Sequence, residues 1–165
     1  MNAIVITDRK WAIGRDNTLL FPSFHEDRKR FRAITNGGTV LVGRKALESF
    51  PGGRPLSNRR NIVLTSHDIE IEGAEVVHTA EEMIKAVESE NTDHVYVIGG
   101  GSVYTALLPL CKHVYRTKVD ALGEGADTWF PNLDKLPGWE VENIAEPITE
   151  NGVTYQFIDY VNTKI

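Results

Sequence analysis

Four short apolar runs, separated by segments with helical spacing, constrain the fold of this chain most strongly. Each run is rich in β-branched residues and apolar on both faces, which is typical of a strand buried between layers of helices. Strands that alternate with helices are joined by right-handed crossovers and form a mainly parallel sheet. The runs are residues 3–7, 39–42, 61–64 and 95–98, and the helical segments are residues 27–35, 45–50, 80–88 and 102–108.

The C-terminal third of the chain has a different pattern. Residues 113–119, 139–148 and 154–161 are strand-like, and no helix of comparable length separates the last two. Asn151-Gly152 lies between these two segments and predicts a type I′ turn, because both central positions of that turn need positive φ. We therefore expect the sheet to end in an antiparallel hairpin.

Length and composition limit the class of protein. A chain of 165 residues fits one domain, which we place over residues 1–165. A net charge of −5 argues against a nucleic-acid-binding surface, and the basic cluster Arg28-Lys29-Arg30 favours a solvated helix face. The single cysteine, Cys111, and the lack of metal-ligand spacing favour a reducing compartment and no metal. With no targeting segment, membrane span or exposed apolar stripe, we expect a cytoplasmic monomer.

Three strand ends carry groups that suit phosphates. Gly99-Gly100-Gly101-Ser102 joins a buried strand to a helix, and the missing Cβ atoms let a pyrophosphate approach the helix N-terminus, although a simple tight turn is an equal alternative. Arg44 and Lys45 open another helix after Gly43, and Thr65-Ser66-His67 follows the next strand. Side by side, these donors would select a nucleotide with a 2′-phosphate, although Arg44 alone could be an exposed charge.

One acidic side chain stands in apolar surroundings. Asp27 lies in the first turn of the first predicted helix, where a carboxylate ordinarily interacts with the helix dipole. Leu20, Phe21, Phe24 and Phe31 flank it, and burial in a pocket that they line would raise the pKa of the carboxyl and fit it for proton transfer. Downstream, one of the adjacent arginines 59 and 60 could grip a substrate carboxylate, although solvated loop charge is the default interpretation.

Taken together and in order, these segments resemble dihydrofolate reductase over essentially the whole chain. The resemblance implies an α/β fold with a central, mostly parallel eight-stranded sheet, four flanking helices and an antiparallel C-terminal hairpin. The ordered set is specific for the family, although no single motif decides it. The matching segments are Ile4-Val5, Ile13-Gly14, Glu26-Asp27 with Phe31, residues 42–45, Glu48-Ser49, Arg54-Pro55-Leu56 with Arg59, residues 61–66, residues 97–104, Thr117 and residues 127–131.

The resemblance also implies a function and its residues. The reaction would be reduction of 7,8-dihydrofolate to 5,6,7,8-tetrahydrofolate by NADPH, with hydride transfer to C6 and protonation at N5. Such an enzyme supports one-carbon metabolism and is a target of antifolates. Asp27 and Thr117 would be catalytic. The substrate would contact Ile4, Val5, Leu20, Asp27, Phe31, Phe50, Leu56, Arg59, which would bind the glutamate α-carboxylate, and Thr117. The cofactor would contact Ile6, Ile13, Gly14, Gly43, Arg44, Lys45, Ala46, Leu64, Thr65, Ser66, His67, Ile98, Gly99, Gly100, Gly101, Ser102, Val103 and Tyr104. Residues 8–20 would form a mobile loop that closes over the nicotinamide.

The chain departs from the family pattern at three places. Family members carry Leu-Pro-Trp shortly before the acid, and this chain has Leu-Phe-Pro-Ser-Phe-His over residues 20–25. Ile6 stands where Ala is common, and Ala46 where Thr is common. His25 could be a solvated turn residue or could couple to the titration of Asp27.

These departures leave alternatives open. One is a related NADPH-dependent reductase of another pterin or of a ribosylated pyrimidine. Asp27 and Arg59 argue against the reductase of a ribosylated pyrimidine, because these residues suit a pterin and a glutamate tail. Another is a protein that binds NADPH without turnover.

Overall fold

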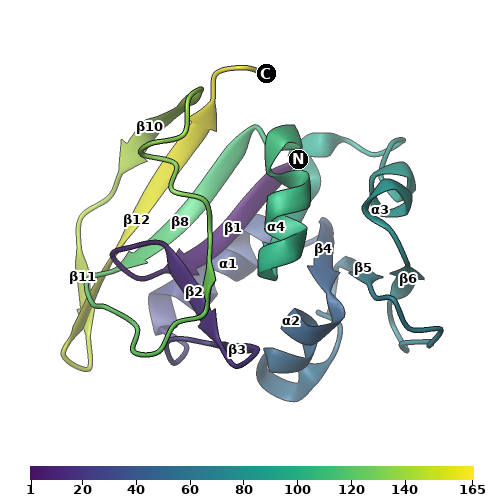
Figure 1. Ribbon diagram of the computed structural model, residues 1–165, viewed down its shortest axis with the longest axis horizontal. Helices are drawn as coiled ribbons and strands as arrows, with labels where there is room; N and C mark the ends of the chain where they lie inside the picture. The colour runs from purple at the N-terminus through teal and green to yellow at the C-terminus, as the bar shows by residue number, and fades with distance from the viewer.

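The computed structural model describes residues 1–165, apart from the side chain of Pro51, and is built on one large mixed sheet (Figure 1). Its eight-strand path runs β10-β12-β8-β1-β7-β4-β5-β6, and β11 pairs with β12 beside this path. The strands are β1 (Asn2–Thr7), β4 (Thr39–Gly43), β5 (Arg60–Leu64), β6 (Glu75–Val77), β7 (Val95–Gly99), β8 (His113–Val119), β10 (Trp139–Ile144), β11 (Ile148–Glu150) and β12 (Val153–Asn162). The predicted fold is confirmed: the pairs from β8 to β6 are parallel, and β12 runs antiparallel to β8, β10 and β11.

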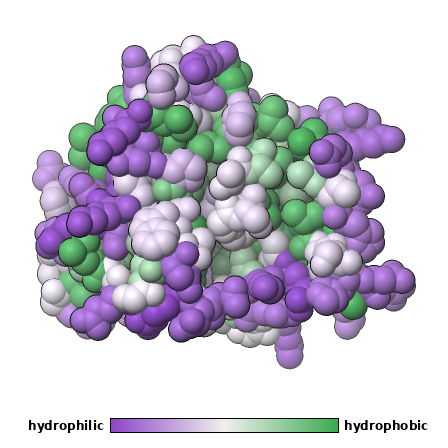
Figure 2. All heavy atoms as spheres, viewed as in Figure 1, coloured by the Kyte–Doolittle hydropathy of each residue, from purple (hydrophilic) through white to green (hydrophobic). Residues whose placement is uncertain are grey.

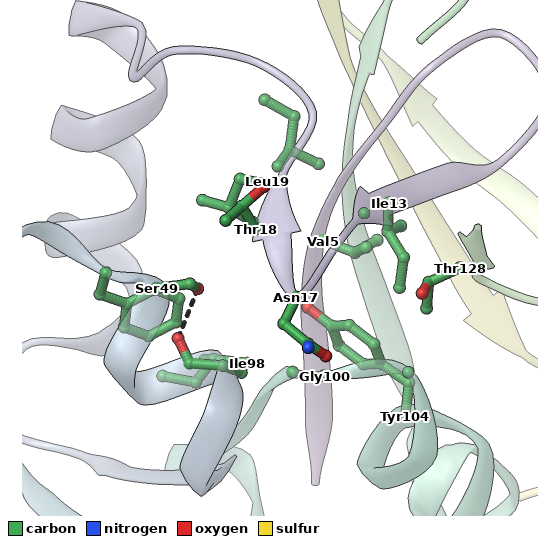
Figure 3. Close-up of a pocket in the computed structure, with 16 residues that line it drawn as sticks. Val5, Ile13, Asn17, Thr18, Leu19, Ser49, Ile98, Gly100, Tyr104 and Thr128 are labelled. Carbon is green, nitrogen blue, oxygen red and sulfur yellow. Dashed lines mark hydrogen bonds between the residues drawn. The ribbon is translucent and has the colours of Figure 1, made fainter. Parts of the chain in front are cut away.

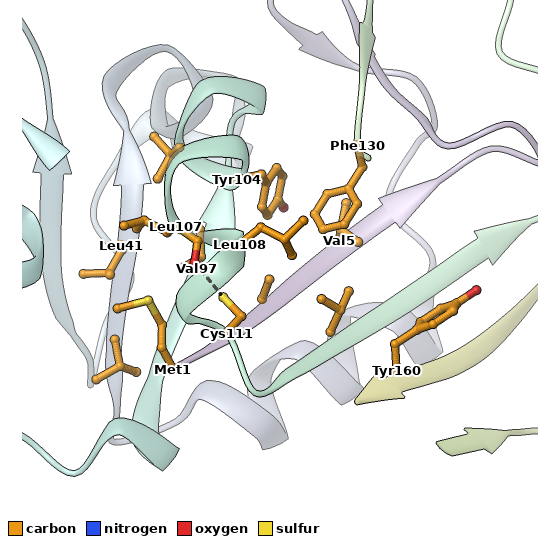
Figure 4. Packing of buried hydrophobic residues seen from close by; sticks show 14 of the residues in the cluster. Met1, Val5, Leu41, Val97, Tyr104, Leu107, Leu108, Cys111, Phe130 and Tyr160 are labelled. Atoms are coloured by element: carbon orange, nitrogen blue, oxygen red, sulfur yellow. Dashed lines mark hydrogen bonds between the residues drawn. The ribbon is translucent and has the colours of Figure 1, made fainter. Parts of the chain in front are cut away.

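The helices within the described residues cover both faces of this sheet. On one face, α1 (His25–Thr35) and α2 (Arg44–Ser49) pack on the core residues Val40, Val42 and Tyr96. On the other face, α3 (Ala80–Ala86) and α4 (Gly101–Leu107) pack on a core that includes Leu41 and Val97 (Figure 4). Short 3₁₀ turns are η1 (Pro51–Gly53), η2 (Thr92–His94) and η3 (Leu108–Leu110). The central strands are therefore buried on both faces, as their apolar runs predicted.

A small second sheet was not predicted. It consists of β2 (Ala12–Arg15), β3 (Thr18–Leu19) and β9 (Thr128–Trp129), in the order β3-β2-β9. Asp16 and Asn17 form the β2–β3 turn with φ of 51° and 61°. Asn and Asp tolerate this left-handed region better than most residues, which makes the tight hairpin possible.

The C-terminal region confirms one prediction and corrects another. Asn151 and Gly152 have φ of 50° and 78° and connect β11 to β12, as the predicted turn requires. The single strand expected over residues 139–148 is wrong, because β10 and β11 are separate strands that both pair with β12. Pro147 lies between them and has no N–H to donate to a ladder, which accounts for the interruption.

Candidate active site and cofactor cleft

The carboxyl group of Asp27 lies in the first turn of α1 and meets β8. Thr117 Oγ1 donates a hydrogen bond to Asp27 Oδ1 at 2.5 Å. Burial raises the pKa of Asp27 above its ordinary value, while the bond from Thr117 and the charges of Arg30 and Arg28 act in the opposite direction. Such a carboxyl holds its proton to a higher pH than an exposed aspartate, which suits a group that supports proton transfer.

The C-terminal hairpin positions the start of α1 and with it Asp27. The N-cap residue, Phe24, makes no side-chain capping bond. Instead, the Glu150 carboxylate accepts the backbone N–H of His25, with N···O distances of 2.9 and 3.1 Å. Phe24 is buried and stacks on Tyr155, with 4.7 Å between the ring centroids. A carboxylate and an aromatic stack from distant strands therefore fix where the helix begins.

A cavity lies one strand away from this carboxyl. Ile6 of β1 lines the cavity and pairs in register with Thr117 of β8. Figure 3 shows Asn17 in the middle of the view beside Gly100 and Tyr104, with Ser49 and Ile98 on the left and Ile13 and Thr128 on the right. The predicted site residues that line it are Val5, Ile6, Ile13, Gly14, Ala46, Phe50, Ile98, Gly99, Gly100, Gly101 and Tyr104.

A second, more polar cavity lies at the ends of β4 and β5. The predicted cofactor residues that line it are Gly43, Arg44, Lys45, Leu64, Thr65, Ser66, His67, Gly100, Gly101, Ser102 and Val103. Arg44 Nη1 is 2.8 Å from Glu48 Oε1, an i,i+4 pair that orients the guanidinium. Cations and hydroxyls gathered at neighbouring strand ends are groups of the kind that can bind a phosphate monoester.

The glycine-rich turn connects the two cavities, because Gly100 and Gly101 line both. Gly99 has φ of 126°, which disfavours any residue with a Cβ. A Cβ on Gly101 would lie 2.7 Å from the Thr128 methyl carbon. Backbone without side chains at a helix start, between a mainly apolar and a polar cavity, fits the pyrophosphate of a dinucleotide. Every predicted cofactor residue lines at least one of these cavities.

The predicted substrate residues also assemble around α1. Ile4, Phe31, Phe50 and Leu56 pack against one hydrophobic cluster. Arg59 Nε donates to Thr35 Oγ1 at 2.8 Å and Nη1 to the Ser57 carbonyl at 2.9 Å, and its guanidinium is 5.9 Å from the Phe31 ring centroid. An apolar wall that ends in an oriented guanidinium suits an aromatic substrate with a terminal carboxylate. Leu20 instead packs near Gly123, and its neighbour Leu19 lines the first cavity.

Comparison with known proteins agrees with this geometry. The family model described as dihydrofolate reductase matches residues 1–162. The chain belongs to the dihydrofolate reductase family. The dihydrofolate reductase of Bacillus subtilis (strain 168) is 34% identical over 160 residues, covering 95% of this chain and 91% of the relative. That of Staphylococcus haemolyticus is 30% identical over 166 residues, covering 100% and 96%.

A solved structure supports the same assignment and the cofactor. Dihydrofolate reductase from Enterococcus faecalis, complexed with NADP(H) and RAB-propyl, has a TM-score of 0.83 and 33% identity, covering 97% of this chain and 94% of that one. As a member of this family, the chain is an NADPH-dependent oxidoreductase that reduces dihydrofolate to tetrahydrofolate.

The departures from the dihydrofolate reductase pattern have visible structural consequences. Ile6 and Ala46 both line the first cavity, so they replace polar or smaller contacts with apolar wall. Phe24, in the segment that lacks the family tryptophan, is core rather than pocket, since it is 3% exposed. The His25 side chain is 67% exposed and has Nε2 3.8 Å from Glu26 Oε1, which favours the solvated alternative.

Residues 8–20 are tied to the segment 120–128 rather than lying apart. Asp8 is buried, its Oδ1 accepts the N–H groups of Lys10 and Ala12, and its Oδ2 accepts that of Gly123 at 2.9 Å. Asp127 Oδ2 accepts the N–H of Asp16 at 2.9 Å. The predicted loop is thus a hairpin held by two carboxylates over the first cavity.

Several residues that line the two cavities are not indicated by the sequence patterns. His78 and Thr79 line the second cavity, and His78 Nδ1 is 2.8 Å from the Thr65 carbonyl oxygen. The strand that brings them there, β6, is only three residues long. Its Val77 pairs with Leu64 of β5, and this pairing places His78 beside Thr65. Asn17, Thr18, Ser49 and Thr128 line the first cavity, and the last is supplied by the unpredicted β9.

Proposed function

We propose that Asp27 is the acid of this reaction, in which hydride passes to C6 of 7,8-dihydrofolate and a proton is added at N5. The observation that carries the proposal is the Asp27–Thr117 hydrogen bond, one strand from the cavity that Ile6 lines. Bound NADPH supplies the hydride and leaves as NADP⁺. Asp27, with its raised pKa, holds the pterin and supports the proton that balances the reduction.

We assign the remaining contacts by the chemistry of each group. Residues 99–102 hold the central phosphates, and Arg44, Thr65, Ser66 and His67 hold the 2′-phosphate. Phe31 packs against the pterin and the aminobenzoyl ring, and Arg59 binds the glutamate α-carboxylate. The hairpin of residues 8–20 closes over the nicotinamide and shields the transfer from water.

We also propose that residues 1–165 act as one domain and as a cytoplasmic monomer in one-carbon metabolism. One sheet carries both cavities, which supports a single domain. Hydrophilic residues form the rim of the face in Figure 2, with neutral and apolar residues over its middle. Cys111 is buried. None of the helices that the structure describes could cross a bilayer, and its described residues hold no cluster of three metal-ligating side chains.

Oxidation of NADPH in the presence of dihydrofolate tests the acid. We expect Asp27→Asn to lower kcat/KM at neutral pH by about 10²-fold or more, the range of general acid catalysis. Thr117→Val removes only the orienting bond, so we expect about a 10-fold loss, equivalent to roughly 1.4 kcal/mol.

NADPH affinity, measured by quenching of tryptophan fluorescence, is the control and should stay within about twofold in both variants. An Asp27→Asn protein as active as the wild type would show that another group supports the proton.

A further inference from the structure

Two side chains of α1, one turn apart, are anchored to the same face of the sheet. Asp27 receives its hydrogen bond from Thr117 of β8, and Arg30 Nη2 donates to Asp159 Oδ1 of β12 at 2.5 Å. Thr117 pairs with Phe157, and Tyr115 pairs with Asp159, in the antiparallel ladder of these two strands. Because alternate residues of a strand share a face, all four strand residues lie under α1.

The guanidinium of Arg30 is enclosed rather than solvated. Its side chain is 23% exposed and that of Asp159 is 17% exposed. The guanidinium carbon lies 4.5 Å from the Phe157 ring centroid and 5.7 Å from that of Tyr115. Carboxylate and aromatic faces together hold the charge in one place. The solvated helix face predicted for residues 28–30 is therefore wrong at Arg30, although Arg28 is exposed.

Arg30 lies close enough to Asp27 to act on it. Residues three apart on a helix have Cβ atoms about 5–6 Å apart. Its positive charge favours the carboxylate form of Asp27 and so opposes the effect of burial on the pKa of that group. Asp159 neutralises part of this charge. Arg28 is also near, but its guanidinium bonds Ser23 in solvent, where screening weakens its effect.

We propose that Arg30 is a positioning residue whose charge, partly neutralised by Asp159, sets the pH range over which Asp27 is protonated. The inference rests on the proposed role of Asp27. Arg30 forms its ion pair with Asp159 and Asp27 its hydrogen bond with Thr117, so the two α1 side chains interact through the electric field between them. Removal of Arg30 and removal of Asp159 should therefore have opposite effects.

The charges of the other ionisable groups around Asp27 must be the same in every variant of the test. On α1 these are Glu26 and Arg28. Tyr115 lies on β8, Tyr155 on β12 and Tyr104 on α4, and burial raises the pKa of all three tyrosines, so they stay neutral where Asp27 titrates. Glu150 of β11, near Tyr155, remains in every variant.

The experiment compares Arg30→Met with Asp159→Asn. Met keeps much of the apolar stem over Phe157 but removes the charge, and Asn keeps the shape of the carboxyl but releases the charge of Arg30. The Asp27 carboxyl is followed by ¹³C NMR over a pH series in the complex with NADP⁺ and folate, with its resonance assigned from Asp27→Asn. The pH profile of kcat/KM is measured in parallel.

We expect the Asp27 midpoint to rise by about 0.5 pH unit or more in Arg30→Met and to fall by about as much in Asp159→Asn. These shifts are smaller than the roughly 1–3 units of an adjacent opposite charge, because the two groups are not in contact. Arg30→Lys keeps a charge and should restore the midpoint to within about 0.2 unit of the wild type.

A merely structural role gives a different result. Both variants break the same ion pair, so loosening of α1 would lower thermal stability and move the midpoint in the same direction in both. Midpoints that move together, or that do not move, would overturn the proposal. The NMR midpoint reports the effect of Arg30 on Asp27 without turnover. A pH profile of kcat/KM that is the same in the wild type and in Asp27→Asn would instead overturn the role of Asp27 as the acid.

Discussion

At the scale of single residues, burial disfavours the charged form of Asp27, and the reaction needs a group that can carry a proton. Its folded-state pKa is raised, so the group binds a proton more tightly in the folded than in the unfolded chain. The resulting stability is present at low pH and is lost as the pH rises through the folded pKa. At neutral pH the ionised carboxyl therefore reduces stability, as is common for functional groups.

This sign predicts that Asp27→Asn stabilises the protein although it lowers activity. We expect a higher Tm than the wild type at pH 7.5 and a smaller difference at pH 4, where more of the wild-type carboxyl is protonated. Asn can still accept the Thr117 bond, so packing is retained. Differential scanning calorimetry at the two pH values measures the difference. A variant less stable than the wild type at pH 7.5 would contradict the argument.

At the scale of elements, the β2–β3 hairpin is held over the first cavity by a carboxylate from outside it. Asp127 accepts the N–H of Asp16 and a bond from Thr128 Oγ1 at 2.9 Å, and these bonds, the first the strongest, lower its pKa. A lowered pKa means that the stabilisation is present above the ordinary value and is lost only as pH falls through the folded value. The hydrogen bond from Asp16 to Asp127, which we call the clasp, is therefore formed at neutral pH.

Opening this clasp should slow the enzyme without unfolding it. In Asp127→Asn the acceptor loses its charge, so we expect the amides of Asp16 and Asn17 to exchange hydrogen faster. We also expect KM for NADPH to rise about 5- to 10-fold. Because Asn17 lines the cavity, affinity and order of the hairpin should change together.

A matched variant lies three residues away in the same segment. Glu124→Gln makes the same change of charge, but Arg15 bonds the carbonyl of Glu124 rather than its side chain. We expect it to leave both readouts near the wild type. Equal effects of the two substitutions would show that net charge, and not the clasp, is responsible.

At the scale of the whole molecule, Arg116 joins the strands that carry the site. It is 1% exposed, and its guanidinium donates to Thr7 Oγ1 at 2.8 Å, Tyr160 Oη at 3.1 Å and the Asp8 carbonyl at 3.2 Å. The guanidinium carbon lies 3.5 Å from the Trp11 ring centroid. Burial lowers the pKa of Arg116 below its ordinary value, whereas Tyr160, Asp134 and Asp8 act in the opposite direction. Three strands and the start of the hairpin therefore depend on one side chain.

Arg116→Ala should lower the free energy of unfolding by about 3 kcal/mol, because it leaves buried polar groups without a partner and opens a cavity. Urea unfolding followed by tryptophan fluorescence measures this. Arg9→Ala is the control: that side chain is 52% exposed, pairs with Asp120, and should cost about 0.5 kcal/mol or less. A loss below about 1 kcal/mol for Arg116→Ala would contradict the role assigned to it.

The sequence by itself determined the buried strands, the four helices, the hairpin at Asn151-Gly152 and the groups gathered at the glycine-rich turn. These features follow from local patterns: apolar periodicity, turn residues and the order of polar groups at strand ends. The sequence did not predict the small sheet, β6 or the break between β10 and β11. Strands of two to four residues carry too little periodicity to be recognised, and distant partners stabilise them.

Only the tertiary structure decided which charges meet. Arg30 and Asp159 are 129 positions apart, and nothing near Arg30 in the chain distinguishes it from the exposed Arg28. His78 belongs to the second cavity because β6 pairs with β5. The register of strand pairing, which brings together residues far apart in the chain, fixes these contacts, and local periodicity does not report it.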